Sequence, residues 1–357
     1  MFVPPRCPSL LCPAHAKPTA YLETGGFFYR NGRYQPKCRA HAVPRFKCKV
    51  CGCNFSRQTF RMDYGDNKPH LNAMLFKLLA SGLGLRQSAR VLGLSRRCTE
   101  LKARKLSRHL GRLTRNLTGQ FAEGSVFGLD EMETFETERA VLPVTVPILI
   151  ETRSMFVIAT DVAPIRPSGK LNAARRAAIA KAETRYGRRP NRSRQAVERT
   201  FKRLAAHTKH VDTIEFVSDR KHLYGQLLAK WFTNRGKQVV HRLVSSRRKR
   251  DQTNPLRHSN LTNAMARDLV GRLRRESWLV SKRRRFLRLQ LYVFAAYRNF
   301  VRRRINRETP TPAEALGFSK RALTFDELLT WRQDWKGKSI HPIALRTESV
   351  AALRLAA

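Results

Sequence analysis

Two aspartates, Asp130 and Asp219, stand where apolar, strand-like runs end, and carboxylates in such places can bind metal ions. Asp130 follows the run VFGL and Asp219 closes the run IEFVS. If the two strands pair in parallel, which requires a crossover such as a helix within residues 170–210, both carboxylates emerge side by side. Two-metal phosphodiester chemistry needs oxygen ligands around cations about 3.5–4 Å apart. The pair predicts such a site, although either aspartate alone could simply begin a turn.

A third metal ligand is expected from the helix that follows the last strand-like run, QVVHRLV. No acid occupies the first turn of that helix. The candidates are Asn260 near its start, Asp251 before it, and Asp268 and Glu276 within it. The amide of Asn260 offers a neutral carbonyl oxygen, which can coordinate magnesium. Arg267 follows Asn260 by seven residues, two turns along the same face, and could steady a phosphate.

The elements that would position these residues can be predicted from the apolar pattern. From Val126 on, the runs VFGLD, VTVPILIE and MFVIATDV predict a three-stranded meander. An Ala/Arg/Lys-rich helical stretch follows at residues 170–210, and then come two strands, IEFVSD and QVVHRLV. The pattern predicts a long helix at residues 260–278, a basic amphipathic helix at 286–303 and a short helix at 325–331. The predicted fold class is therefore α/β.

A metal-binding module is predicted near the N-terminus, because six of the seven cysteines lie between Cys7 and Cys53. In a reduced compartment such a cluster favours metal over disulfides. Cys48-x-x-Cys51 is a knuckle that presents two thiolates to one tetrahedral ion, and Cys7-x4-Cys12 could supply the other pair. Zinc in such a closed site is structural, and it would supply the folding energy of a small segment. Further candidate ligands are Cys38, Cys53, His15 and His41.

A helix-turn-helix is predicted in the stretch GLRQSARVLGLSRRCTELKARKLSRHL. Its turn is at Gly93, Ser95 is placed to cap the following helix, and that helix is basic. The packed face is expected to consist of Ala89, Val91, Leu92 and Leu94. The side chains expected to reach DNA are Arg86, Arg96, Arg97, Thr99 and Lys102. An ordinary helical hairpin is the alternative.

The charge of the chain indicates a polyanionic partner. Its 357 residues include 71 lysines and arginines against 26 acids, a formal net charge of +45, and no fold requires such an excess. A basic run is expected to grip the nucleic-acid backbone rather than read bases: Arg247, Arg248, Lys249 and Arg250. No apolar run of about 18 residues is present to span a bilayer, and we expect an intracellular protein.

In their order along the chain, these stretches resemble the bacterial insertion-sequence DDE transposases that carry a zinc ribbon and a helix-turn-helix before an RNase-H-like core. The matching stretches are RFKCKVCGCNFSRQTF, SGLGLRQSARVLGLS, FGLDEMETFE, FVSDRKHLYG, NLTNAMARDLVGRLRRESWLVSK and RRRINRETPTPAEALGF. The resemblance implies Asp130 and Asp219 as ligands of Mg²⁺ or Mn²⁺, Asn260 in the third position and Arg267 as its basic partner.

The resemblance also implies a domain order and partners. The expected parts are a zinc ribbon at residues 1–62, a helix-turn-helix domain at 68–118, a catalytic core at 124–305 with a basic helical insertion at about 165–208, and a tail at 306–357. The implied partner is double-stranded DNA, the terminal inverted repeats of a mobile element, bound by a homo-oligomer at the bacterial nucleoid. Two alternatives stay open: a transposase-derived DNA-binding regulator that has lost catalysis, and a basic RNA-binding structural protein.

Overall fold

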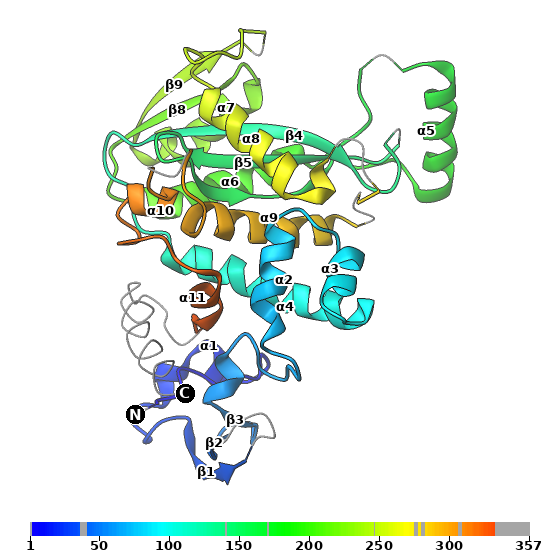
Figure 1. Ribbon diagram of the computed structural model, residues 1–357. Coiled ribbons are helices and arrows are strands. Elements are labelled where there is room, and N and C mark those ends of the chain that lie inside the picture. The colour runs from blue at the N-terminus through cyan, green and yellow to red at the C-terminus, as the bar shows by residue number, and fades with distance from the viewer. Residues whose placement is uncertain are drawn as a thin grey trace. The chain divides into compact units, whose positions relative to one another are not determined.

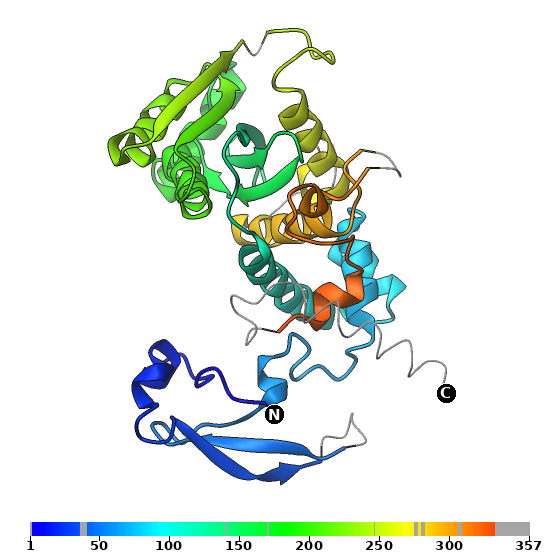
Figure 2. The ribbon, with the colours of Figure 1, turned by 90° about the vertical axis from the view of Figure 1, so that its left-hand side faces the viewer.

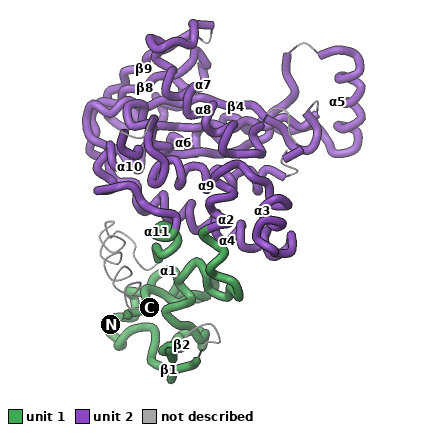
Figure 3. The backbone as a smooth tube through the Cα atoms, viewed as in Figure 1, with its two compact units in different colours: residues 1–73, 326–357 green, residues 74–325 purple. Residues whose placement is uncertain are grey.

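The structure is a computed structural model, and it describes residues 2–35, 41–139, 141–169, 171–245, 247–274, 278–279, 283–305 and 309–332. The chain forms two compact units, one of residues 1–73 and 326–357 and one of residues 74–325 (Figure 3). Among the described helices, none has an apolar stretch that could cross a membrane.

The first unit is built on a small antiparallel sheet of order β1-β2-β3, drawn in blue in Figure 2. Buried phenylalanines, among them Phe27, Phe46 and Phe55, stack beside three buried cysteines and form its small core. The elements are α1 (Pro13–Ala16), η1 (Pro18–Tyr21), β1 (Phe28–Tyr34), β2 (Val43–Cys48), β3 (Asn54–Ser56) and η2 (Arg57–Phe60). Helix α2 (Leu71–Ala80) crosses the boundary between the units, as does α11 (Phe325–Thr330).

The second unit is a mixed α/β domain around one mixed sheet of order β6-β5-β4-β8-β9, with β7 beside β5. Its strands are β4 (Val126–Phe135), β5 (Pro143–Glu151), β6 (Phe156–Thr160), β7 (Ala163–Pro164), β8 (Thr213–Asp219) and β9 (Gln238–Val244). Strands β4, β5 and β6 form an antiparallel meander, whereas β8 is parallel to β4, and β9 to β8. The predicted α/β class is confirmed, and so is the order of a three-stranded meander, a helical stretch and two further strands; the two-residue strand β7 is an addition to it.

The helices of this unit pack on both faces of the sheet (Figure 1). Helices α6 (Ser193–His207) and α7 (His222–Trp231) cover one face, where Phe201 packs against Phe216. Helices α8 (Arg257–Leu269) and α9 (Arg284–Phe300) cover the other face, where alternate residues of β5 join the main core. The remaining elements are α3 (Leu85–Val91), α4 (Arg96–Leu117), α5 (Ala173–Tyr186), η3 (Thr233–Arg235), η4 (Gly271–Leu273) and α10 (Pro312–Ala315).

Two predicted helical segments differ from the observed ones. The helix predicted at residues 260–278 ends at Leu269, because Val270 is extended and a short 3-10 turn follows. The basic insertion predicted at about 165–208 is narrower, because α6 is a core crossover helix whose Ala196, Val197 and Phe201 are buried. Within the described part of this stretch, α5 is the helix without a buried residue, and Figure 1 shows it standing away from the sheet.

The helix-turn-helix segment is not separated from the sheet. Leu106, Leu110 and Leu113 form a buried stripe along α4, which packs on α9. A Cβ atom at Gly111 would lie 2.8 Å from the ring of Tyr292, so this glycine permits the close approach of the two helices. The boundary predicted between residues 118 and 124 therefore falls inside one compact unit.

Candidate active site

The two predicted aspartates lie at matched positions on neighbouring parallel strands. The pairing of β4 with β8 places Gly128 opposite Val217, and Asp130 and Asp219 each follow two residues later. Because side chains alternate along a strand, both carboxylates share the sheet face of Gly128 and Val217. Helix α8 packs on this face. The predicted parallel pairing with a helical crossover is confirmed.

The prediction that Asp130 ends its strand is wrong. Strand β4 continues to Phe135, because it pairs with β5 along its whole length. Its pairing with β8 stops at Gly128, and β8 itself ends at Asp219, as predicted. Asp130 therefore lies beside the end of β8, in a longer strand that extends past its neighbour.

Helix α8 supplies an amide to Asp130, and it comes from Asn263 rather than from Asn260. The Asn263 amide nitrogen donates to Oδ2 of Asp130 at 2.6 Å, and Asn263 is buried. Asn260 is half-buried one turn earlier in α8, and Arg267 one turn later. The spacing of three and four residues puts all three on one helix face. Asn263 is the residue that sequence reasoning missed, although it lies in the same NLTN run.

The close approach of α8 depends on a glycine in β4. A Cβ atom at Gly128 would lie 2.9 Å from Oγ of Ser259 and 3.0 Å from a methyl group of Thr152. Both distances are shorter than ordinary van der Waals contacts, so a larger residue would force α8 and β4 apart. Gly128 thus helps to set the distance between Asn263 and Asp130.

Burial raises the pKa of Asp130 above its usual range, and the neighbouring Asp219 carboxylate raises it further. Two hydrogen bonds act in the opposite direction, from the backbone N–H of Glu131 and from the Asn263 amide. A partly buried carboxylate beside a second one is an arrangement that a divalent cation would stabilise. The donor set of two carboxylates and an adjacent amide fits the oxygen preference of magnesium.

The raised pKa predicts that Asp130→Asn stabilises the metal-free protein at pH 7. When the pKa of a carboxyl is higher in the folded state than in the unfolded state, the protein becomes less stable as pH rises through that pKa, because folding disfavours the charged form. Asparagine has no such charge, so we expect the melting temperature to rise by a few degrees. The difference should shrink as pH falls below the ordinary aspartate pKa of about 3.9, where the carboxyl becomes protonated in both the folded and the unfolded state. Thermal unfolding in chelator at pH 7 and at about pH 3 measures the difference between variant and wild type. A lower melting temperature of the variant at pH 7 would contradict the prediction.

A second acid, Glu131, lies on the opposite face of β4 and holds several elements together. Its carboxylate pairs with Lys221 and accepts hydrogen bonds from Thr145 at 2.7 Å, Ser193 at 2.8 Å and Tyr224 at 2.9 Å. These contacts lower the pKa of Glu131 despite its burial. They join β4 to β5, to the start of α6 and to the segment just after Asp219. The network therefore fixes the two aspartate-bearing strands relative to one another.

Replacing Lys221 by methionine should destabilise the second unit by about 1–2 kcal/mol, since the charge of Glu131 would keep only its neutral donors. A second substitution, Glu131→Gln, should recover part of the loss because it removes the unpaired charge. Chemical denaturation of the two single variants and of the double variant gives the coupling. If the losses in unfolding free energy of the two single variants add up in the double variant, the ion pair contributes nothing to stability.

The other candidates for the third ligand are placed elsewhere. Asp251 accepts from the N–H and the hydroxyl of Thr253, at 2.9 and 2.8 Å, and so closes its own turn. Asp268 is exposed on α8. Glu276 lies outside the described residues.

The four preferred cysteines come together in the first unit. The sulfur atoms of Cys7, Cys12, Cys48 and Cys51 all lie within 4.8 Å of one another. Cys7 and Cys51 are 3.5 Å apart and Cys12 and Cys48 are 3.8 Å apart, close to the roughly 3.8 Å between thiolates on a tetrahedral zinc ion. The thiols of Cys7, Cys12 and Cys48 are buried, and Cys51 is exposed. This cluster could hold a metal ion such as zinc.

The environment of the cluster fits a closed metal site. Burial raises the pKa of the Cys7 and Cys12 thiols, whereas the backbone N–H of Cys53 lowers the pKa of Cys51. His15 is engaged elsewhere, because its Nδ1 lies 2.7 Å from the carbonyl oxygen of Cys7. Neither Cys53 nor the exposed His41 belongs to the cluster. Cys38 lies outside the described residues.

Helices α3 and α4 are joined by a tight turn, and the residues predicted to contact DNA divide into two groups. Gly93 takes a positive φ of 59° in the turn, and Ser95 caps α4 by accepting from the N–H of Cys98. Exposed side chains are Arg86, Arg96 and Arg97. Thr99 and Lys102 are 0% and 5% exposed, because they lie on the side of α4 that packs inwards. These two are not available to DNA in this structure, and Val91, predicted to pack, is exposed.

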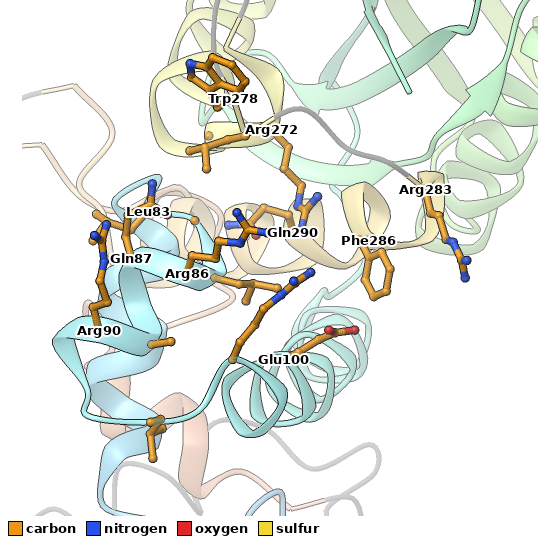
Figure 4. A pocket seen from close by; sticks show the side chains of 17 residues that line it. Leu83, Arg86, Gln87, Arg90, Glu100, Arg272, Trp278, Arg283, Phe286 and Gln290 are labelled. Carbon is orange, nitrogen blue, oxygen red and sulfur yellow. The ribbon is translucent and has the colours of Figure 1, made fainter. Parts of the chain in front are cut away.

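A large pocket of about 1640 Å³ opens beside α3 and the start of α4. Figure 4 shows Arg86 of α3 and Arg272 of η4 reaching into it from different walls, with Phe286 of α9 nearby. The lining also includes Arg90 and Arg96. Helices α3 and α4 thus present several of their arginines to a broad hollow.

The basic run Arg247–Arg250 follows the end of β9, and all four side chains are exposed. Because β4, β8 and β9 are parallel, their carboxyl ends lie towards the same edge of the sheet. The run therefore lies at the edge where β8 ends with Asp219. The carbonyl oxygen of Lys249 accepts from the Asn254 amide at 2.7 Å, which ties this loop to the approach to α8.

No protein-family model and no curated protein matches the chain. Among solved structures, it is similar to one described as "Crystal structure of the Mos1 Strand Transfer Complex". The sequences are 12% identical, the match covers 63% of this chain and 73% of that one, and the TM-score is 0.24. A superposition this poor assigns neither a fold nor an activity to this chain.

Proposed function

We propose that the protein is a transposase of the DDE type, which cleaves DNA at the ends of a mobile element and transfers the cut strands. The observation that carries the proposal is the pairing of Asp130 and Asp219 on neighbouring parallel strands, on the face covered by α8. A sheet of this order supports an RNase-H-like core. The charge of +45 supports a DNA partner.

In this proposal Asp130 and Asp219 hold the catalytic cations, magnesium or manganese, and Asn263 keeps Asp130 in place. Bound metal ions would activate the attacking oxygen and stabilise the leaving one. Asn260 and Arg267 share the helix face of Asn263, where an amide oxygen could complete a metal site and a guanidinium could hold a phosphate. The basic run Arg247–Arg250 would bind the DNA backbone at the same sheet edge.

The four-cysteine cluster would hold a structural zinc ion, and the helix-turn-helix would bind the terminal inverted repeats. Arg86, Arg96 and Arg97 remain the candidate contacts, whereas the buried Thr99 and Lys102 do not. Joining two element ends would require at least two copies of the chain, bound together on DNA at the nucleoid.

A second candidate function is a DNA-binding regulator that has lost catalysis. It is favoured by one observation: α8 presents amides, Asn260 and Asn263, where a third carboxylate would give a stronger metal site. Both functions require DNA binding, and only the transposase requires metal-dependent cleavage.

Cleavage of DNA that carries the element's own ends, assayed with the full-length protein and Mg²⁺ or Mn²⁺, separates the two. Metal-dependent nicking supports the transposase. Tight binding without nicking under either metal supports the regulator.

Substituting Arg96 and Arg97 together by alanine should weaken duplex binding uniformly across sequences if they contact phosphates. The slope of log affinity against log salt should then fall by about 1 for each lost contact. Thr99→Val is the matched control, because its side chain is buried and should leave the salt slope unchanged. Fluorescence anisotropy over a salt series measures both; an unchanged slope in the double variant would remove these arginines from the interface.

A further inference from the structure

We propose that a second basic pocket, remote from the aspartate pair, binds a phosphate-bearing ligand. The pocket has a volume of about 500 Å³ and lies along the edge strand β6, between α4, α6 and α9. In the sheet order, β6 is separated from β4 by β5. Six arginines line it: Arg115, Arg192, Arg199, Arg203, Arg284 and Arg288.

The pocket contains more positive charge than its acids neutralise. Asp161 is the one carboxylate in the described lining, and it already pairs with Arg199 and with Arg288. Arg284 pairs with Glu136 at 2.9 Å, outside the lining. Among the described residues, no carboxylate pairs with the other three arginines.

Arg203 is the central member of this unpaired group. It is half-buried, and burial lowers the pKa of its guanidinium, as does the nearby Arg115, whereas Tyr292 and Asp161 act in the opposite direction without cancelling the fall. Asp161, the acid that acts on Arg203, already pairs with Arg199 and Arg288. A bound anion would therefore relieve both the burial of Arg203 and its repulsion by Arg115. This arrangement, rather than the overall charge of the surface, distinguishes the pocket from exposed arginines elsewhere.

The chemistry of the lining indicates phosphate. Guanidinium groups bind phosphate oxygens through paired N–H donors, which an ammonium group cannot do. The volume lies within the range of small-ligand pockets, roughly 300–1,000 Å³, and Tyr292 with Ala295 adds a partly apolar wall. The phosphate could belong to a free nucleotide-sized molecule or to the backbone of DNA.

The test is calorimetric titration of the full chain with inorganic pyrophosphate, with and without a saturating DNA duplex. Arg203→Gln should weaken pyrophosphate binding by at least tenfold. Arg115→Gln should have the same effect, and because its side chain is exposed, this variant should fold even if Arg203→Gln does not. Arg194→Gln is the control, because Arg194 is an exposed residue of the same helix that bonds to Gln226 outside the pocket.

The duplex distinguishes the two sources. If the duplex displaces pyrophosphate and Arg203→Gln binds the duplex more weakly, the pocket binds the DNA backbone. Independent binding assigns it to a free phosphorylated ligand. Equal pyrophosphate affinity in the wild type and in both pocket variants, or an equal loss in Arg194→Gln, would overturn the proposal. Because the assay measures no cleavage, its failure leaves the proposed transposase activity untouched.

Discussion

Asp219→Asn is expected to lower the rate of metal-dependent strand cleavage by about a thousandfold or more, which corresponds to about 4 kcal/mol of transition-state stabilisation. The substitution keeps the size of the side chain and removes one of two carboxylates at matched positions in β4 and β8. One remaining carboxylate cannot hold two divalent ions. Single-turnover cleavage of an element-end substrate measures the loss.

DNA binding by the same variant should stay within a few-fold of the wild type, because the helix-turn-helix arginines belong to other elements. Asp268→Asn is the matched control: it removes one negative charge from an exposed site of α8 and should leave cleavage unchanged. An equal fall in binding and cleavage for Asp219→Asn would show that this aspartate acts through folding or DNA affinity.

Cys48→Ser is expected to abolish metal binding by the first unit and to unfold it. Cys48 is buried in the cluster of four thiols, and the small aromatic core beside it offers little other stabilisation. Structural zinc in such modules supplies on the order of 10 kcal/mol of folding free energy, so the loss should exceed the stability of the module. Metal analysis should fall from one zinc ion per chain to none.

Limited proteolysis should then cut within residues 1–62 and leave the second unit intact, and a strong chelator should have the same effect on the wild type. Cys53→Ser is the control, because Cys53 lies outside the cluster. Retention of zinc by Cys48→Ser, or resistance of the segment to protease after chelation, would exclude a structural metal site.

Local patterns in the sequence were sufficient to predict much of this fold. The alternation of apolar runs predicted the meander, and the position of Ser95 predicted the start of α4. Spacing also identified the four cysteines, since a knuckle and a second pair have few other uses in a short segment. Each of these features depends on neighbours in sequence.

Features that depend on tertiary contacts could not be predicted in the same way. Thr99 and Lys102 look like surface residues of a basic helix, but their burial follows from how α4 packs within the second unit. The length of β4 beyond Asp130 follows from its pairing with β5.

Two further contacts show the same limit. The choice of Asn263 over Asn260 follows from the rotation of α8 against the sheet. The partners of Glu131 come from β5, α6 and the segment after β8, which no local pattern brings together.

Iron-directed backbone cleavage can locate a metal site at Asp130 and Asp219, since Fe²⁺ can replace Mg²⁺ and generates hydroxyl radicals where it binds. With ascorbate and peroxide, we expect cuts in the chain near Asp130 and Asp219. These cuts should be reduced by excess Mg²⁺ and lost in the variant that carries both Asp130→Asn and Asp219→Asn. Cuts confined to residues 1–62, or cuts unchanged in the double variant, would contradict a metal site between the two strands.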